Sequence, residues 1–425
     1  MGRSSKGDLI TLQDLFELRI STLWRYFKSE SFAFWMICAY LFLEYFRPQS
    51  IYPQLAFLPW AQLAVLGAFV GCFSDKNVTW VKSSLNVWML AFFTVIITSS
   101  VLAYWPSVSY QNLENFYTWF IIYFLAINIV NTEKRLFIFL SIFLLASFKL
   151  SLSLAITWAK RGFSFTDWGL KGPPGFFENS GELAIQMLVF WPVALAFAIC
   201  LKPYVSKVKF YILLLMPATA IMVIIGSSSR GAQLALLAQL VVINYKSILN
   251  PKVLITCAVI IAILWTALPE EQKERFQVVG NDRTSQQRLL YWTNGFDMLN
   301  DHPIFGVGYF NFVPYYERFY RDDMIYGNAE LPHNILVQVG TDAGYVGLSI
   351  FAILILLAIN KMRKLKDITS VFKGEMYLNP ASLNISLLGF FVAGQFVTVA
   401  YYPFLWIHLA FVVAVYNVSS RKKCN

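Results

Sequence analysis

Long apolar runs alternate along the chain with short polar segments. Many of these runs approach the length that a helix needs to cross about 30 Å of hydrocarbon. The pattern predicts an all-α polytopic membrane protein with about twelve transmembrane helices, in one integral domain over residues 1–425. The predicted helices are centred near residues 40, 64, 94, 121, 146, 192, 217, 239, 261, 346, 391 and 410.

Two connections are too long to be simple links between these helices. The first runs from about Ala159 to Glu182, and the second, residues 269–332, lies between the ninth and tenth predicted helices. Long ordered connections commonly form lids or binding walls on a rigid scaffold. We therefore expect residues 269–332 to form a large cap with short helices of its own.

An apolar stripe within this second connection recurs at helical spacing. It predicts a helix that lays the stripe on the membrane or on the helix bundle, with Gln287 and Arg288 near its polar side. The stripe consists of Leu289, Trp292, Phe296 and Leu299.

The distribution of Lys and Arg predicts the orientation. The basic segments fall on alternate sides of the predicted helices, so all of them, with both termini, can be cytoplasmic, and both long connections are then outside. The net charge of +10 is explained by this topology and by attraction to anionic lipid. Such short and dispersed basic loops do not indicate a nucleic-acid partner. They are the N-terminal segment and the segments around residues 76–82, 134–135, 202–209, 246–252, 361–373 and 421–423.

Composition agrees with this class. The chain is 57% hydrophobic and 14% charged, which excludes an ordinary soluble domain, because a soluble core cannot bury that much apolar surface. The five cysteines show no spacing typical of a disulfide framework or a metal site.

Candidate chemistry begins with three arginines in the predicted outer segments. Arg230, in Ser229-Arg230-Gly231, stands where a helix begins, and free backbone N–H groups at a helix start together with a guanidinium form a receptor for phosphate oxygens. The competing interpretation is an arginine that extends to the membrane edge. Arg283 and Arg288 are further external cations, for which ordinary surface charge is the alternative.

His333 opens the tenth predicted helix. It repeats by heptad with Gly340 and Gly347, while Asn334 and Gln338 share a helix face. A polar residue at a bilayer boundary is costly unless it faces protein or water, and a neutral imidazole is suited to accept a proton from a sugar hydroxyl. The alternative is a structural histidine that caps the helix.

Other polar residues are weaker candidates. Glu178 and Asn179, in the Gly-rich segment 172–181, either bind sugar hydroxyls or shape the cavity. His302 and His408 are expected to be structural. Asp322 and Asp323 form an external acidic pair, for which a solvated turn is the simpler explanation than a metal site.

These motifs, taken in order, resemble the bacterial O-antigen ligase and polymerase superfamily. The resemblance covers mainly residues 175–350, and the spacing from His333-Asn334 to Gly344-Tyr345-Val346-Gly347 is most similar to the ligase branch. It also includes Ser229-Arg230-Gly231 and the segment from His302-Pro303 to Gly306-Val307-Gly308.

The resemblance implies a GT-C-like, inverting glycosyltransferase that works without metal or cofactor. It would move a glycan from undecaprenyl diphosphate to a hydroxyl acceptor, lipid A-core oligosaccharide in the ligase branch, at the periplasmic face of the bacterial inner membrane. His333 would be the base or would position the acceptor, Arg230 and Arg288 would hold the diphosphate, and Arg283 would assist. Glu178, Asn179, Asn334 and Gln338 are the further substrate-binding candidates.

Three alternatives stay open. A glycan polymerase or a protein O-oligosaccharyltransferase would share the donor site and differ in the acceptor. A secondary transporter would show related halves and broken helices near the membrane midplane, and we find no similarity between the halves. The sequence identifies neither the acceptor nor the sugars.

Overall fold

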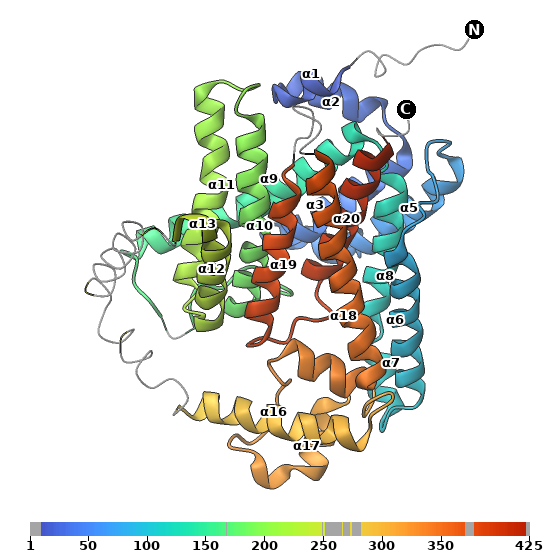
Figure 1. Cartoon of the computed structure of the whole chain (residues 1–425), viewed down its shortest axis with the longest axis vertical. Helices are drawn as coiled ribbons and strands as arrows, with labels where there is room; N and C mark the ends of the chain where they lie inside the picture. Colours follow the sequence, from blue (N-terminus) through green and yellow to red (C-terminus); the bar gives the residue numbers. More distant parts are fainter. Residues whose placement is uncertain are drawn as a thin grey trace.

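The protein is all-helical, as predicted (Figure 1). The computed structural model describes residues 10–166, 168–248, 282–369 and 378–421, with the single positions 250, 266 and 273. No β-strand occurs among these residues. The predicted span near residue 261 lies outside the described residues.

The helices succeed one another in the chain as follows. They are α1 (Leu12–Phe16), α2 (Ile20–Ser29), α3 (Phe32–Phe46), α4 (Pro48–Ile51), η1 (Pro53–Phe57), α5 (Trp60–Ser74), α6 (Ser84–Val101), α7 (Pro106–Asn112), α8 (Glu114–Ile129), α9 (Glu133–Lys160), α10 (Ser180–Leu201), α11 (Lys207–Gly226), α12 (Arg230–Ile243), α13 (Tyr245–Ile248), α16 (Arg283–Asp301), α17 (Phe312–Phe319), η2 (Arg321–Asp323), α18 (Ile335–Thr369), α19 (Pro380–Gly394) and α20 (Pro403–Arg421).

Several of these helices can cross a membrane. Within the described residues, 6 are long and apolar enough: α6, α9, α10, α11, the Ile335–Leu365 part of α18 and the Pro403–Ser420 part of α20. Shorter apolar helices are α5, α12 and α19. Every predicted centre that falls on described residues lies inside a helix. The chain is thus a multi-pass membrane protein, whereas the count of twelve spans stays a prediction.

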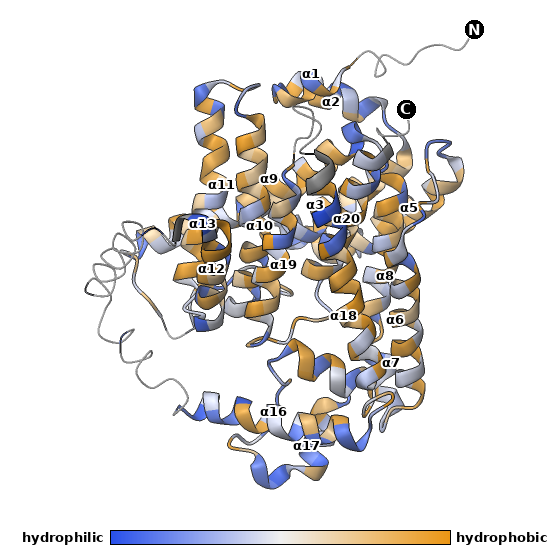
Figure 2. Cartoon of the chain, in the orientation of Figure 1, coloured by the Kyte–Doolittle hydropathy of each residue, from blue (hydrophilic) through white to orange (hydrophobic). Residues whose placement is uncertain are grey.

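A helical cap covers one end of the bundle (Figure 1). It comprises α16, α17 and η2, within residues 282–334, and α1 and α2 lie at the opposite end. Apolar residues dominate the bundle helices, while the cap carries many polar ones (Figure 2). The cap has its own small core, centred on Tyr291, Phe312 and Tyr316.

Buried polar side chains fix the helices that carry the site. Gln239 of α12 accepts a hydrogen bond from the Trp191 indole of α10 at 2.8 Å. Its amide donates to the carbonyl of Leu188 in α10 at 2.9 Å and to that of Ile385 in α19 at 2.8 Å. Because an unsatisfied amide is costly in an apolar interior, these three bonds hold α10, α12 and α19 in one arrangement.

Helix α18 is broken at Gly344, whose φ of 66° and ψ of −171° are not helical. In a continuous helix the Tyr345 N–H would donate to the Thr341 carbonyl. Instead Tyr345 donates to the Pro303 carbonyl, and the Val307 N–H donates to Thr341, each at 2.8 Å. The segment 302–308 therefore satisfies the backbone groups that the break exposes, and it joins the cap to the bundle.

One prediction about α16 is wrong. Gln287 is buried rather than near the polar side. Its side chain accepts from the Ile325 N–H at 2.5 Å and donates to the Asp323 carbonyl at 3.3 Å. The stripe divides, because Leu289 and Phe296 are each 52% exposed whereas Leu299 is buried. The face of α16 that packs against the cap core is thus rotated about the helix axis from the face that the apolar stripe predicts.

Candidate active site

Three helix N-termini meet at the cap side of the bundle, around the segment 395–402 that joins α19 to α20. They belong to α10, α12 and α18. A Cβ placed on Gly181 of α10 would lie 3.1 Å from Val397 Cγ2 and 3.9 Å from the Oγ of Ser229, the N-cap of α12. At the start of α18, the His333 N–H donates to Thr398 Oγ1 at 2.8 Å. Helix N-termini carry partial positive charge, so their convergence favours an anion.

Arg230 is the first residue of α12, directly after Ser229, whose side chain accepts from the Ala232 N–H. Its guanidinium lies 3.4 Å from the Asp282 carboxylate, and its side chain is 34% exposed. Asp282 is the N-cap of α16 and accepts from the Ser285 N–H at 2.9 Å. Burial acts to raise the pKa of Asp282, but the Ser285 bonds and the Arg230 charge outweigh it and lower that pKa. The ion pair joins α12 to the cap.

Arg288, one and a half turns into α16, is largely buried beside Arg230. Its Nε is buried and has no hydrogen-bond partner within the described part of the chain. Burial and the Arg230 charge lower the pKa of Arg288, while Asp282 and Glu330 act in the opposite direction. Arginine remains charged at neutral pH all the same. The two predicted arginines are therefore close enough to interact electrostatically, and the carboxylates of Asp282 and Glu330 also act on Arg288.

His333 adjoins this pair through Glu330, whose Oε2 lies 3.1 Å from the His333 Nε2. The hydrogen bond with His333 lowers the pKa of Glu330, and the Arg288 charge adds to this against the effect of burial. His333 has a φ of 52°, a conformation that non-glycine residues seldom adopt and that concentrates at functional sites. The sequence analysis missed Glu330, although an acid three residues before the histidine was visible.

The remaining predicted residues of α16 and α18 have partners inside the protein. Arg283 donates to the Ile325 carbonyl at 2.9 Å and lies over the Tyr326 ring, 5.3 Å from its centroid. Asn334 Oδ1 caps α18 by accepting from two backbone N–H groups. Gln338 is buried and accepts from the Ala400 N–H at 3.1 Å. In the structure these three side chains hold the walls of the site.

The segment 172–181 lies at the start of α10. Asn179 is the N-cap of that helix and accepts from the Gly181 N–H at 2.9 Å, while Glu178 is exposed. A second carboxylate that the sequence analysis missed is Glu182, which accepts from the Tyr402 hydroxyl at 2.8 Å. Its place three residues after the N-cap is typical of a capping box. The sequence therefore suggests only a local role for Glu182 and does not predict its contact with Tyr402.

The other candidate groups lie apart from this cluster. His302 contacts the Tyr315 hydroxyl at 3.0 Å, and Asp323 accepts from the Asn294 amide at 2.8 Å within the cap. Among the described residues no group of three or more His, Cys, Asp or Glu side chains is arranged to hold a metal ion.

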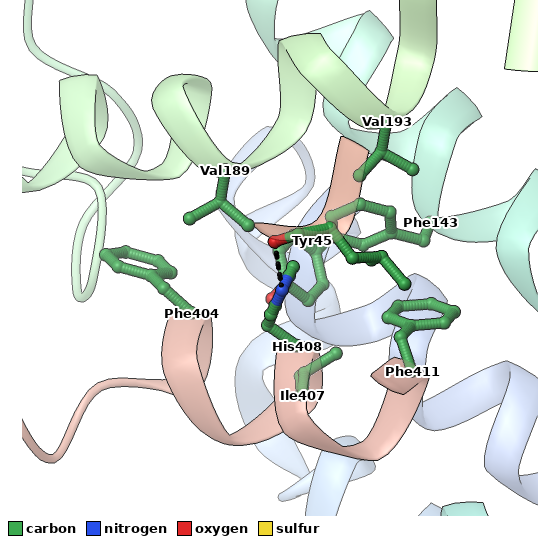
Figure 3. A pocket seen from close by; sticks show the side chains of 9 residues that line it. Tyr45, Phe143, Val189, Val193, Phe404, Ile407, His408 and Phe411 are labelled. Carbon is green, nitrogen blue, oxygen red and sulfur yellow. Dashed lines mark hydrogen bonds between the residues drawn. The ribbon is translucent and has the colours of Figure 1, made fainter. Parts of the chain in front are cut away.

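His408 lines a small apolar cavity inside the bundle, shown in Figure 3, where its Nε2 lies 3.0 Å from the Leu383 carbonyl. Aromatic and aliphatic side chains surround it, and none of them is charged. The cavity is thus unsuited to a diphosphate. The other lining residues are Tyr45, Phe143, Val189, Val193, Phe404, Ile407 and Phe411.

The fold and this cluster define a multi-pass helical membrane protein with an arginine and histidine site between its bundle and a helical cap. Residues 213–352, from α11 into α18, match the family described as O-antigen ligase. The match includes Arg230, Arg288 and His333, and it confirms the resemblance of the chain to the O-antigen ligase superfamily. No curated protein matches the chain.

Proposed function

We propose that the protein is an inverting glycosyltransferase that moves a glycan en bloc from undecaprenyl diphosphate to an acceptor hydroxyl at the periplasmic face. The family match supports a membrane enzyme of the O-antigen ligase and polymerase type in general. The observation that carries the finer proposal is the Arg230–Arg288 pair next to His333, where three helix N-termini meet.

The donor would place its diphosphate on the two arginines. When the anomeric C–O bond breaks, negative charge grows on the phosphate oxygen that leaves with the lipid. Guanidinium groups and helix N-termini already aimed at that position stabilise the transition state more than the ground state, and this lowers the barrier. Arg288 brings an Nε with no partner in the described chain, so a phosphate oxygen would satisfy a donor that is otherwise open.

His333 would serve the acceptor. With its Nε2–H donating to Glu330, the Nδ1 is the nitrogen that can take a proton from the attacking hydroxyl, and the carboxylate stabilises the imidazolium that forms. The acceptor oxygen bonds to the anomeric carbon as the carbon–phosphate oxygen bond breaks on the opposite face, so the anomeric configuration inverts. The lipid diphosphate leaves, and the histidine later releases its proton to water.

The alternatives differ in how they use the same features. A polymerase or a protein O-oligosaccharyltransferase would share this donor site, with a growing glycan or a protein in place of lipid A-core. Among the described residues, the break in α18 is a feature that a transporter would also show. However, the backbone groups that it exposes at Thr341 and Tyr345 are already bonded to residues 303–307, so they are not open to a solute.

Deletion of the gene tests the proposal. We expect the lipid-linked glycan to accumulate, and the missing product to be capped lipopolysaccharide for a ligase, long polymer for a polymerase, or glycoprotein for a protein glycosyltransferase. Purified protein with donor and acceptor should form product in excess EDTA, because arginines supply the charge stabilisation that a divalent ion supplies elsewhere. Glycan that fails to reach the periplasm in the deletion strain would reject the proposal in favour of transport.

A further inference from the structure

A second polar and aromatic cluster lies at the cap-side end of α10, beside the arginine site. It consists of Glu182, Tyr402 and Phe176. The Tyr402 hydroxyl donates to Glu182 at 2.8 Å, and the Phe176 ring meets the Tyr402 ring edge to face at 5.0 Å between centroids. All three side chains are partly accessible. The cluster therefore brings together a carboxylate, a hydroxyl and an aromatic ring, each partly accessible.

Its place in the first turn of α10 does not by itself account for the bond of this carboxylate to Tyr402. An acidic side chain at a membrane boundary is costly, and such residues are kept mainly where they bind something. The Glu182 carboxylate interacts with the Asn179 backbone N–H and accepts from Tyr402, and its two oxygens can accept further hydrogen bonds. Nearby, Trp119 meets the Phe176 ring at 5.5 Å, and its Nε1 is buried without an acceptor within the described residues.

The place of the cluster relative to the arginines suggests which substrate it serves. At one end of the segment 395–402, Phe396 packs against Gly231 of α12 and lies 6.4 Å from the Trp292 ring of α16. In the middle, Thr398 accepts from the His333 N–H. At the other end, Tyr402 reaches Glu182. The segment 395–402 thus contacts α12, the start of α18 and this cluster in turn. An inverting attack requires the nucleophile and the leaving group on opposite faces of the anomeric carbon.

We propose that Glu182, Tyr402 and Phe176 form the binding subsite for the acceptor sugar, an inference that rests on the proposed glycosyltransferase function. The carboxylate accepts hydrogen bonds from adjacent sugar hydroxyls, and the aromatic ring packs on the apolar face of the same sugar. A charge-assisted bond of this kind is about twice as strong as a neutral one. It also discriminates against a sugar that lacks the hydroxyl, because one acceptor position of the carboxylate is then left unsatisfied.

Steady-state transfer by the purified full-length protein tests the subsite. With a soluble sugar acceptor, Glu182→Gln should raise the acceptor KM about tenfold or more, the loss expected for a hydrogen bond to a charged group. The donor KM should stay within about twofold. Tyr402→Phe should raise the acceptor KM less, and Glu182→Asp should recover part of the loss. Glu114→Gln is the matched control, because Glu114 is also acidic, in the first turn of α8, and exposed.

An acceptor analogue without the contacted hydroxyl provides the second measurement. It should be a poor substrate for the wild type, and Glu182→Gln should not worsen it further. An unchanged acceptor KM in Glu182→Gln, while the wild type transfers normally, would refute the subsite and leave the proposed function intact. A wild type without transfer would refute the function itself. A parallel rise in donor and acceptor KM with a lower melting temperature would make Glu182 structural and also refute the subsite.

Discussion

Arg288 allows catalysis and stability to be separated in one substitution. Arg288→Met removes the guanidinium but keeps most of the aliphatic stem, so packing changes little. If the guanidinium stabilises charge on the departing diphosphate, transfer should fall about 10²- to 10³-fold, the cost of removing one such donor from a preorganised site. That factor corresponds to about 2.7–4 kcal/mol of transition-state stabilisation.

The structure predicts no matching loss of stability. The Arg288 Nε has no partner to lose within the described residues. The pKa of Arg288 is lowered by burial and by Arg230, so its charged form is held at a cost in the folded state. Removal of that charge ends the repulsion between Arg288 and Arg230, and it also removes a buried hydrogen-bond donor that has no partner in the described part of the chain. We therefore expect the melting temperature of Arg288→Met to equal or exceed that of the wild type, as at other sites where function and stability conflict.

Transfer from the lipid-linked donor and the melting temperature should be measured on the same detergent-purified protein. Arg318→Met, on the exposed last turn of α17, is the control and should leave both unchanged. Transfer by Arg288→Met within a few-fold of the wild type would refute the diphosphate assignment. A clear fall in melting temperature would show instead that Arg288 holds the cap in place.

Four further substitutions test other parts of the site and of the fold around it. His333→Ala should lower transfer about 10²-fold or more without loss of donor binding. Glu330→Gln should lower transfer about tenfold, because a neutral amide stabilises the imidazolium less well. Equal activity in the wild type and in both variants would leave His333 as a helix cap. Asp282→Ala should cost about 1 kcal/mol of stability through loss of the α16 cap. Since the pKa of Asp282 is lowered in the folded state, its ionised form stabilises the protein above the usual Asp pKa of about 3.9, and this stabilisation disappears as the pH falls through the folded-state pKa. The difference in melting temperature between wild type and Asp282→Ala should thus be constant above about pH 5 and shrink below about pH 4; a difference that persists in acid would exclude the charge as its source. Gly344→Ala should lower the melting temperature more than Gly162→Ala, although both glycines have a φ near 65°, because a Cβ at Gly344 would meet the backbone of residues 304–305 while one at Gly162 meets nothing; equal effects would show that the break in α18 is not constrained by the cap.

Hydropathy placed a helix at each predicted centre that falls on described residues, but it did not reveal the break in α18. The run from Ile335 onwards is apolar enough to predict one continuous span, and Gly344 is only one of several glycines in it. The break depends on the segment 303–307, which bonds to Thr341 and Tyr345. This contact joins segments that are distant in the sequence, so the hydrophobic pattern within the span cannot predict it. Gln287 was misplaced for the same reason, because its partners lie on another part of the cap.

The three principal candidate residues could be named from the sequence. Arg230 and His333 stand in short motifs that the family resemblance orders, and Arg288 is an external cation to which the resemblance gives a role. Their neighbours could not be named. Glu182 and Tyr402 are 220 residues apart in the chain, and neither belongs to a motif that suggests the other. Glu330 is close to His333 in the sequence, but an acidic residue on an exposed turn belongs to no distinctive sequence pattern. Only its distance to His333 in the structure marks it as part of the site.

The topology itself helps to make an anion site. Helices α10, α12 and α18 all run from the cap side toward the other end of the bundle, so each presents its N-terminus to the same place. The positive ends of three helix dipoles therefore add there before any arginine is considered. Arg230 sits at one of those N-termini and Arg288 arrives from the cap. The affinity for the donor should then depend on the contacts that attach the cap to the bundle, because Arg288 belongs to the cap and Arg230 to the bundle.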